Sequence, residues 1–349
     1  MTELRLKVLI ASFIEPEHVD TIRQVAPERV EVIYEPTLLR KPRYVADHNG
    51  HPTSRTPEDE TRWRGLLAQA DVLFDFDFTN DADLPDLAPR VRWIQASSAG
   101  IGQFVVRRNY HERMKHTVFT TARGVHAIPL AEFCAMAMLG FSRGLFQMTA
   151  LQAEKKWERF AATDLVGRTV VIFGHGSIGR EVGRLAQAFG MKALGVKRSV
   201  THEKPHEHHA DELHPSSSLP DLLPRADFLV LVAPHTNETE SVLGRKEIAL
   251  LPKGAVIINI GRGALIDEPA MIEALQSGHL GGAALDVFAT EPLPVDSPLW
   301  SMPNVLVSPH SASTSDRENG RLTALFCDNL RRFLDGAPLR NVLNAERFY

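Results

Sequence analysis

The chain has 349 residues, enough for about two domains, and its share of apolar (44%) and charged (23%) residues is that of an ordinary globular protein. Its 39 basic and 43 acidic residues are well mixed and leave a formal charge of −4, which argues against a nucleic-acid partner. No apolar run has the length of a membrane span and no secretory signal precedes the first strand, so we expect a cytoplasmic chain without a membrane partner.

Short β-branched segments alternate with helical patterns along most of the chain, which is typical of parallel α/β sheets. Five such segments lie in the first half, at residues 7–13, 30–35, 70–76, 91–97 and 116–122. Six more lie in the second half, at residues 169–173, 192–196, 227–232, 255–260, 283–287 and 304–308. Eleven strands are too many for one ordinary sheet, so we predict two doubly wound domains.

Two segments outside these sets have strong helical patterns. Residues 126–157 contain Pro129 near their start and no later proline, which predicts one long, largely buried helix between the domains. Residues 315–336 predict an amphipathic helix that ends at Gly336 and returns to the first domain. Its apolar face comprises Leu322, Leu325, Phe326, Leu330 and Phe333.

Two other stretches do not follow the pattern. Residues 36–60 carry four prolines and few apolar residues, which predicts an irregular excursion. Residues 201–214 gather five histidines, and we interpret them as a solvated loop because a metal site needs fixed geometry and supporting partners. We expect no metal site, and we expect Cys134 and Cys327 to be buried free thiols because neither belongs to a CxxC motif.

Gly174, Gly176 and Gly179 form a GxGxxG pattern between a predicted strand and a predicted helix, the context in which this pattern binds dinucleotides. The first glycine permits a tight turn, the second a close approach of the pyrophosphate, and the third close packing of the helix. The N-terminus of the helix would then receive the phosphates. A purely structural strand-to-helix turn is the alternative.

The acidic residue that holds the ribose hydroxyls of NAD is expected about 20 residues after this pattern. The sequence instead has Lys197, Arg198 and Ser199 there, and it has no acidic residue between Glu181 and Glu203. Positive charge and a hydroxyl group suit a 2′-phosphate, so we predict a preference for NADP over NAD. A basic surface turn that accepts either cofactor is the alternative.

Arg262, Glu291 and His310 each follow shortly after a predicted strand. Singly they could be a turn arginine, a loop acid before proline and a capping histidine. Ligands of open α/β sheets bind at the carboxyl ends of the strands, where these three side chains could converge. An anion clamp, an orienting carboxylate and a proton donor together suit the reduction of a carbonyl beside a carboxylate.

The chain resembles the D-isomer-specific 2-hydroxyacid dehydrogenase family in three long stretches, residues 173–196, 259–294 and 305–313. The resemblance implies that Arg262, Glu291 and His310 are catalytic. It also implies a Rossmann cofactor domain at 122–312 inserted in a flavodoxin-like substrate domain formed by 1–121 and 313–349. Hydride transfer between NAD(P) and a small 2-keto acid or D-2-hydroxy acid is the implied activity, and a homodimer packed through the cofactor domains is the implied assembly.

The resemblance also assigns binding residues. The backbone N–H groups of Ser98, Ala99 and Gly100 would hold the substrate carboxylate together with Arg262, and Asp286 would hold the nicotinamide amide. The full set of expected cofactor contacts is Gly174, Gly176, Ser177, Ile178, Gly179, Lys197, Arg198, Ser199, Pro234, Thr239, Ile260 and Asp286.

Two other functions remain open. Relatives of this fold serve as corepressors that sense the cofactor and bind partner proteins. Phosphite or formate oxidation on the same scaffold is a second alternative. His126 begins the predicted long helix and could contact a ligand there or have only a structural role.

Overall fold

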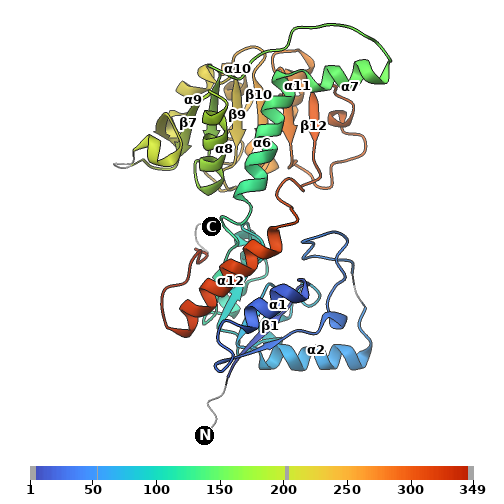
Figure 1. Ribbon diagram of the computed structural model, residues 1–349, viewed down its shortest axis with the longest axis vertical. Coiled ribbons are helices and arrows are strands. Elements are labelled where there is room, and N and C mark those ends of the chain that lie inside the picture. Colours follow the sequence, from blue (N-terminus) through green and yellow to red (C-terminus); the bar gives the residue numbers. More distant parts are fainter. Residues whose placement is uncertain (1–4, 53, 201–203, 345–349) are drawn as a thin grey trace. The chain divides into compact units, whose positions relative to one another are not determined.

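The computed structural model describes residues 5–52, 54–200 and 204–344 (Figure 1). The chain divides into two compact units: unit 1 comprises Met1–His126 and Thr314–Tyr349, and unit 2 comprises Ala127–Ser313. Each unit contains one parallel sheet, with five strands in unit 1 and seven in unit 2 among the described residues. Two parallel α/β units confirm the predicted fold class.

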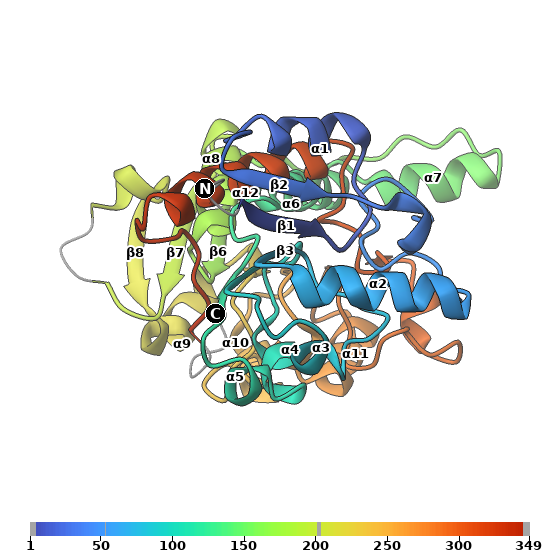
Figure 2. The same cartoon turned by 90° about the horizontal axis from the view of Figure 1, so that it is seen from below.

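The sheet of unit 1 has the order β2-β1-β3-β4-β5, and all its pairings are parallel. Its strands are β1 (Leu6–Ile10), β2 (Val30–Ile33), β3 (Val72–Phe74), β4 (Trp93–Gln95) and β5 (Val118–Thr120). Its helices are α1 (Pro16–Arg23), α2 (Pro57–Gln69), α3 (Leu84–Leu87), α4 (Gly102–Arg107), α5 (Tyr110–Arg113) and α12 (Glu318–Leu334). The helices α1 and α12 cover one face of this sheet and α2 the other (Figure 2).

The amphipathic pattern of α12 explains how the C-terminal segment joins unit 1. Leu322, Phe326 and Leu330 are fully buried, and they pack against the same face of the sheet as α1. The Phe326 ring stacks on Trp93 with 4.9 Å between ring centroids. Gly336 ends the segment with a φ of 66°, a conformation that glycine adopts without strain.

The sheet of unit 2 has the order β12-β11-β10-β9-β6-β7-β8, again with only parallel pairings. Its strands are β6 (Thr169–Phe173), β7 (Lys192–Lys197), β8 (Glu212–Pro215), β9 (Phe228–Leu231), β10 (Val256–Asn259), β11 (Gly282–Leu285) and β12 (Val305–Val307). Its helices are α6 (Ala127–Ser142), α7 (Leu145–Ala153), α8 (Ser177–Ala188), α9 (Leu219–Leu222), α10 (Arg245–Leu250) and α11 (Glu268–Gln276). One face packs against α6 and α8, the other against α9, α10 and α11.

The prediction of one long helix over residues 126–157 is wrong. The segment forms α6 and α7, which meet at an angle of 64°. Gly144 causes the break: its φ is 70°, and a Cβ there would lie 2.6 Å from the ring of Phe160. The helix α7 has no buried residue, so only α6 belongs to the core. No single helix in the described ranges could cross a membrane, and only the bent pair passes that test by length and composition.

The interpretation of residues 201–214 as a solvated loop is also wrong in part. The segment contains a short 3-10 turn, Pro205–His208, and the edge strand β8, which pairs with β7. Edge strands carry polar residues such as Glu212 and His214, so the hydrophobic pattern did not reveal this one. His202 lies outside the described residues.

The predicted excursion is irregular from Leu39 to Pro52 and from Ser54 to Thr56, and it then ends at α2. The Thr56 side chain caps this helix by accepting a hydrogen bond from the N–H of Asp59 at 3.2 Å. Cys134 and Cys327 are both buried and free, as predicted.

Candidate active site

The glycine loop between β6 and α8 has the geometry that close approach of a phosphate requires. Gly174 has a φ of 106°, and a Cβ there would lie 2.4 Å from the backbone nitrogen of Ala233. A Cβ at Gly179 would lie 2.8 Å from the carbonyl oxygen of Gly174, whereas one at Gly176 would enter open space. The first and third glycines are therefore required by packing. The second leaves the N-terminus of α8 open to a ligand, with Ser177 and Ile178 in its first turn.

The end of β7 presents the basic residues expected beside an adenosine. Lys197 is the last residue of the strand, and Arg198 and Ser199 follow it at the surface. The guanidinium of Arg198 donates a hydrogen bond of 2.8 Å to the carboxylate of Glu238, and both side chains are exposed. An acidic side chain thus does reach this position, but from the loop after β9.

The same loop after β9 is folded on itself. The Thr239 hydroxyl donates to the carbonyl oxygen of Pro234 at 2.7 Å and accepts from the N–H of Thr236 at 2.8 Å. Two of the expected cofactor contacts, Pro234 and Thr239, are therefore joined directly. Ile260, another of them, is buried at the end of β10.

The turn that carries Arg262 is fixed by Asn259 and by two glycines. The buried Asn259 side chain accepts from the N–H of Gly261 at 3.1 Å and donates to the carbonyl oxygen of Arg262 at 3.0 Å. A Cβ at Gly263 would lie 2.0 Å from the backbone of Phe288, so only glycine permits the loops after β10 and β11 to approach.

The Arg262 guanidinium is largely shielded from solvent. Burial, the largest effect, lowers its pKa, whereas the charges of Glu291 and Asp286 raise it. Arginine stays protonated in such surroundings. The site therefore contains a permanent cation that feels the charges of two carboxylates.

His310 and Glu291 form a hydrogen-bonded pair, with 2.7 Å between Nδ1 of the histidine and Oε2 of the glutamate. The other carboxylate oxygen of Glu291 accepts from the N–H of Phe288 at 3.1 Å. His310 has a φ of 53°, an uncommon conformation for a residue other than glycine and one often found at functional sites. Its ring is half exposed, and Nε2 remains for a ligand.

Asp286 organises the loop that carries His310. Its Oδ1 atom accepts three hydrogen bonds, from the hydroxyl of Ser308 at 2.5 Å and from the N–H groups of Ser311 at 2.8 Å and Ala312 at 2.9 Å. Its carbonyl oxygen accepts from the N–H of His310 at 2.9 Å. The family resemblance implied a nicotinamide contact for this buried carboxylate; the contacts in the structure are those of a residue that positions the loop.

The remaining expected substrate contacts, Ser98, Ala99 and Gly100, follow β4 in unit 1. Within the described part of the chain, the N–H groups of Ser98 and Ala99 have no hydrogen-bond acceptor, whereas that of Gly100 donates to the Ser98 hydroxyl at 3.3 Å. Asp75 anchors the start of this loop, because its Oδ1 accepts from the N–H of Ser97 at 3.2 Å. Asp75 is fully buried and has a φ of 66°.

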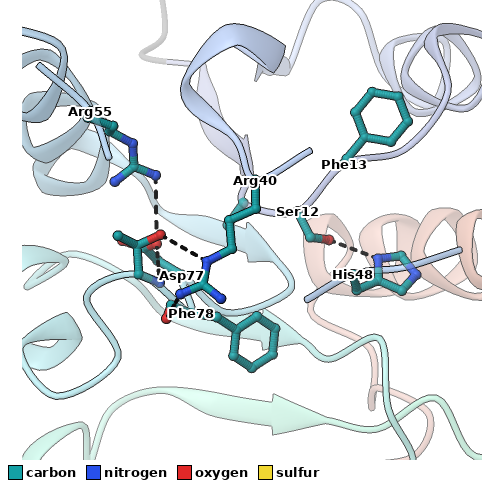
Figure 3. A pocket seen from close by; sticks show the side chains of 9 residues that line it. Ser12, Phe13, Arg40, His48, Arg55, Asp77 and Phe78 are labelled. Carbon is teal, nitrogen blue, oxygen red and sulfur yellow. Dashed lines mark hydrogen bonds and ion pairs between the residues drawn. The ribbon is translucent and has the colours of Figure 1, made fainter. Parts of the chain in front are cut away.

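A polar pocket lies at the same edge of the unit 1 sheet, as Figure 3 shows. The pocket is lined by residues that follow β1 and β3 and by three basic side chains of the excursion: Ser12, Asp77, Phe78, Arg40, His48 and Arg55. The Ser12 hydroxyl and Nδ1 of His48 are 3.0 Å apart, and Arg40 donates to the carbonyl oxygen of Phe78 at 2.7 Å. These contacts hold the excursion at the carboxyl edge of the sheet.

Sequence reasoning missed Asn259, Asp75 and His175. The first two are polar residues at strand ends, where motif spacing gave no signal for a supporting role. His175 occupies the second position of the glycine pattern, and the residue is 1% exposed. His126 pairs with the buried Glu318 at 3.1 Å within unit 1, a structural role that accounts for it without a ligand. Among the residues that the structure describes, no group of three or more His, Cys, Asp or Glu is arranged to hold a metal ion.

Comparison with known proteins gives consistent matches. A family model described as D-isomer specific 2-hydroxyacid dehydrogenase, NAD binding domain, matches residues 135–312. A D-3-phosphoglycerate dehydrogenase from Methanocaldococcus jannaschii is 32% identical over 264 residues, which are 75% of this chain and 49% of that protein. This chain thus spans about half the length of that relative.

Other relatives match over most of their length. A glyoxylate/hydroxypyruvate reductase B from Yersinia pestis is 32% identical over 300 residues, which are 83% of this chain and 89% of that protein. The crystal structure of an NADPH-dependent glyoxylate/hydroxypyruvate reductase from Sinorhizobium meliloti, in complex with NADP and sulfate, has a TM-score of 0.76 and 26% identity. That comparison covers 99% of this chain and all of the other.

Proposed function

This chain belongs to the D-isomer specific 2-hydroxyacid dehydrogenase family, and on that premise we propose that it transfers hydride between a nicotinamide cofactor and a small 2-keto acid or D-2-hydroxy acid. The observation that carries this proposal is the 2.7 Å contact between His310 and Glu291 at the carboxyl edge of a parallel sheet. A histidine held by a carboxylate through one ring nitrogen can exchange a proton through the other. Nε2 of His310 would give that proton to the keto oxygen during reduction.

Arg262 and the Ser98–Gly100 loop would bind the substrate. The guanidinium has further N–H donors beyond the one that Gly261 accepts, and it can fork onto a carboxylate and a keto oxygen. The unused N–H groups of Ser98 and Ala99 suit the substrate carboxylate. Positive charge at Arg262 would also polarise the carbonyl and so favour hydride attack on its carbon.

The glycine loop fits a dinucleotide, because a side chain at Gly176 would fill the open space in front of the N-terminus of α8. We assign the pyrophosphate to this loop, the walls of the cofactor site to Pro234, Thr239 and Ile260, and the nicotinamide amide to Asp286. The nicotinamide, when bound, supplies the hydride in reduction and accepts it in oxidation.

NADPH is the favoured cofactor in this proposal. Lys197, Arg198 and Ser199 would hold the 2′-phosphate. The exposed ion pair between Arg198 and Glu238 is worth at most about 1 kcal/mol, less than the roughly 1.5 to 3 kcal/mol of a hydrogen bond to a charged group. A phosphate can therefore compete with Glu238 for the guanidinium.

We further propose a homodimer that packs through α6 and α7. Large apolar side chains are exposed along these two helices and the segment that follows them: Met136, Leu139, Leu145, Met148 and Trp157. Large apolar side chains exposed close together in the chain are typical of a segment that packs in a protein interface. The absence of buried residues on α7 suggests that this helix packs against a second copy of the chain.

The test is a panel of 2-keto acids (glyoxylate, hydroxypyruvate, pyruvate and phenylpyruvate), each assayed with NADPH and with NADH. We expect reduction of at least one of them, with turnover reduced about a hundredfold or more in His310→Ala and cofactor binding retained. Arg262→Ala should likewise lose most turnover with cofactor binding retained, because the carbonyl is no longer polarised. No reduction of any keto acid, together with oxidation of phosphite or formate, would contradict the proposal.

A further inference from the structure

Loop 288–291, which lies after β11 and ends at Glu291, is held by a side chain from another element. Glu268, the first residue of α11, accepts a hydrogen bond at its Oε2 atom from the N–H of Ala289 at 3.0 Å. The preceding N–H in the loop, that of Phe288, donates to Oε1 of Glu291 at 3.1 Å. Two consecutive N–H groups of the loop therefore bind two different carboxylates, one within the loop and one on α11.

The segment that leads to Glu268 contacts the same loop at a second point. Gly263 lies so near the loop that a Cβ there would be 2.0 Å from the carbonyl group of Phe288 and 2.5 Å from the nitrogen of Ala289. Arg262 directly precedes this backbone contact. The segment thus meets the loop with its backbone at Gly263 and with a carboxylate at Glu268, and two separate contacts fix an orientation that one contact would leave free to pivot.

The carboxylate of Glu268 has little else to bind. Asp267 and not Glu268 caps α11, because Oδ1 of Asp267 accepts from the N–H of Ala270 at 3.1 Å. Within the described part of the chain Glu268 forms no ion pair, and the N–H of Ala289 is the one hydrogen-bond donor to its side chain. Ala289 is exposed, so without Glu268 its N–H would turn to water and the loop would lose a fixed contact.

We propose that Glu268 is a positioning residue for the pair of Glu291 and His310: its bond to the N–H of Ala289 holds loop 288–291 in the conformation in which Glu291 meets the histidine at 2.7 Å. This inference rests on the proposed function, in which His310 gives the proton. A reacting group displaced by about 1 Å can lose about a hundredfold in rate, so a bond that holds its partner in place contributes to turnover. The glycine loop after β6 is formed by other residues, so cofactor affinity should not depend on Glu268.

The test separates the hydrogen bond of Glu268 from its charge. Glu268→Gln keeps a side-chain oxygen that can accept the N–H of Ala289 but loses the charge, which also favours the N-terminus of α11. Glu268→Leu is of similar size and accepts no hydrogen bond. Glu247→Leu is the matched control, because Glu247 in α10 of the same unit accepts the N–H of Gly244 at 3.1 Å and makes no contact with the loop.

The kinetics are measured with NADPH and a keto acid that the wild type reduces. We expect Glu268→Leu to lower kcat about tenfold, the loss typical of one hydrogen bond, with the KM for NADPH nearly unchanged. Glu268→Gln should recover most of this loss, and Glu247→Leu should keep the wild-type kcat. In a chain that already carries Glu291→Ala, Glu268→Leu should change kcat by less than about twofold, because no carboxylate remains to be positioned.

Two measurements without substrate report on the same contact. The amide of Ala289 should exchange its hydrogen faster in Glu268→Leu than in the wild type or in Glu268→Gln. The nitrogen resonance of Nδ1 of His310 should shift in Glu268→Leu and stay close to its wild-type position in Glu268→Gln.

A Gln variant as impaired as the Leu variant would overturn the inference, and so would an equal loss of kcat with and without the Glu291 carboxylate. An equal loss in Glu247→Leu would also overturn it, because the effect would then be one of general destabilisation. These outcomes are distinct from a failure of the proposed function. A wild type that reduces no keto acid contradicts the reaction, whereas the exchange at Ala289 and the His310 resonance still decide whether Glu268 positions the pair.

Discussion

Oε2 of Glu291 lies 2.7 Å from Nδ1 of His310, and Oε1 of the same carboxylate accepts the N–H of Phe288 at 3.1 Å. A backbone contact within its own loop thus orients the glutamate for its contact with the histidine. An oriented carboxylate fixes the ring and stabilises its protonated form by charge. The pair joins the segments that follow two neighbouring strands, β11 and β12, and it is our candidate for the proton-transfer group.

Replacing Glu291 by Gln should lower kcat for keto acid reduction, while the KM for NADPH is nearly unchanged. The amide can still hold the ring through Nδ1 of His310, but it no longer stabilises by charge the form of the ring that donates the proton. A kcat equal to that of the wild type would show that the carboxylate charge does not act on the histidine.

The strands of both sheets could be predicted because buried parallel strands are β-branched runs with clear boundaries, as in β6 and β10. The strand β8 and the break at Gly144 could not be predicted. An edge strand needs no apolar pattern, and glycine within an apolar segment is compatible with both a continuous and a broken helix. At the break Gly144 has a φ of 70°, and the ring of Phe160, which lies beyond the predicted helix, fills the space that a side chain would need there.

The candidate site shows the same division. The residues at strand ends to which we assign the chemistry, such as Arg262 and His310, could be proposed from residue type and spacing. Supporting residues could not, because Asn259 acts through backbone atoms two and three residues away and Asp286 through atoms up to 26 residues away. The Arg198–Glu238 pair joins two loops that are 40 residues apart, and only the fold brings them together.

Arg198 and Glu238 should control cofactor preference in opposite directions. Arg198→Ala removes a phosphate partner, so the preference for NADPH over NADH should fall by roughly ten- to a hundredfold while NADH use is nearly unchanged. Glu238→Gln removes a carboxylate that competes for the guanidinium and repels the phosphate, so the KM for NADPH should fall.

The two substitutions check each other when KM values for both cofactors are compared. An effect of Arg198→Ala on NADPH and NADH alike would mean that the arginine acts on the fold of the loop and not on the phosphate. A wild type that prefers NADH would contradict the assignment outright.

His175 should make the protein less stable in mild acid. Burial, the largest effect, lowers its pKa to about 4; the nearby charges of His208, Arg180 and Lys197 act in the same direction, while the bond to the His208 carbonyl opposes them. The unfolded chain binds a proton at the ordinary pKa of about 6.5 and the folded chain does not. The free energy of unfolding therefore falls as the pH decreases from about 6.5 to about 4, by up to about 3 kcal/mol from this residue.

The measurement is the urea concentration at half unfolding, followed by circular dichroism between pH 7 and pH 4. His175→Gln cannot titrate, so its midpoint should fall less steeply with decreasing pH than that of the wild type. Parallel curves for the two proteins would show that the imidazole binds its proton equally in the folded and unfolded states.

The exposed apolar surface of α7 and the segment after it predicts the assembly. Trp157 is 99% exposed and Met148 is 45% exposed, yet no residue of α7 belongs to the core. A charge placed there should not disturb the fold, but it should oppose burial in an interface, because an unpaired charge is costly to desolvate. We expect light scattering at micromolar concentration to give twice 38.8 kDa for the wild type and 38.8 kDa for the double variant Met148→Glu and Trp157→Glu.

Val295→Glu is the matched control. Val295 is 97% exposed in the same unit but belongs to neither α7 nor the segment after it, so this variant should remain a dimer. A wild-type monomer, or dissociation by the control as well, would assign the exposed side chains of α7 to something other than self-association.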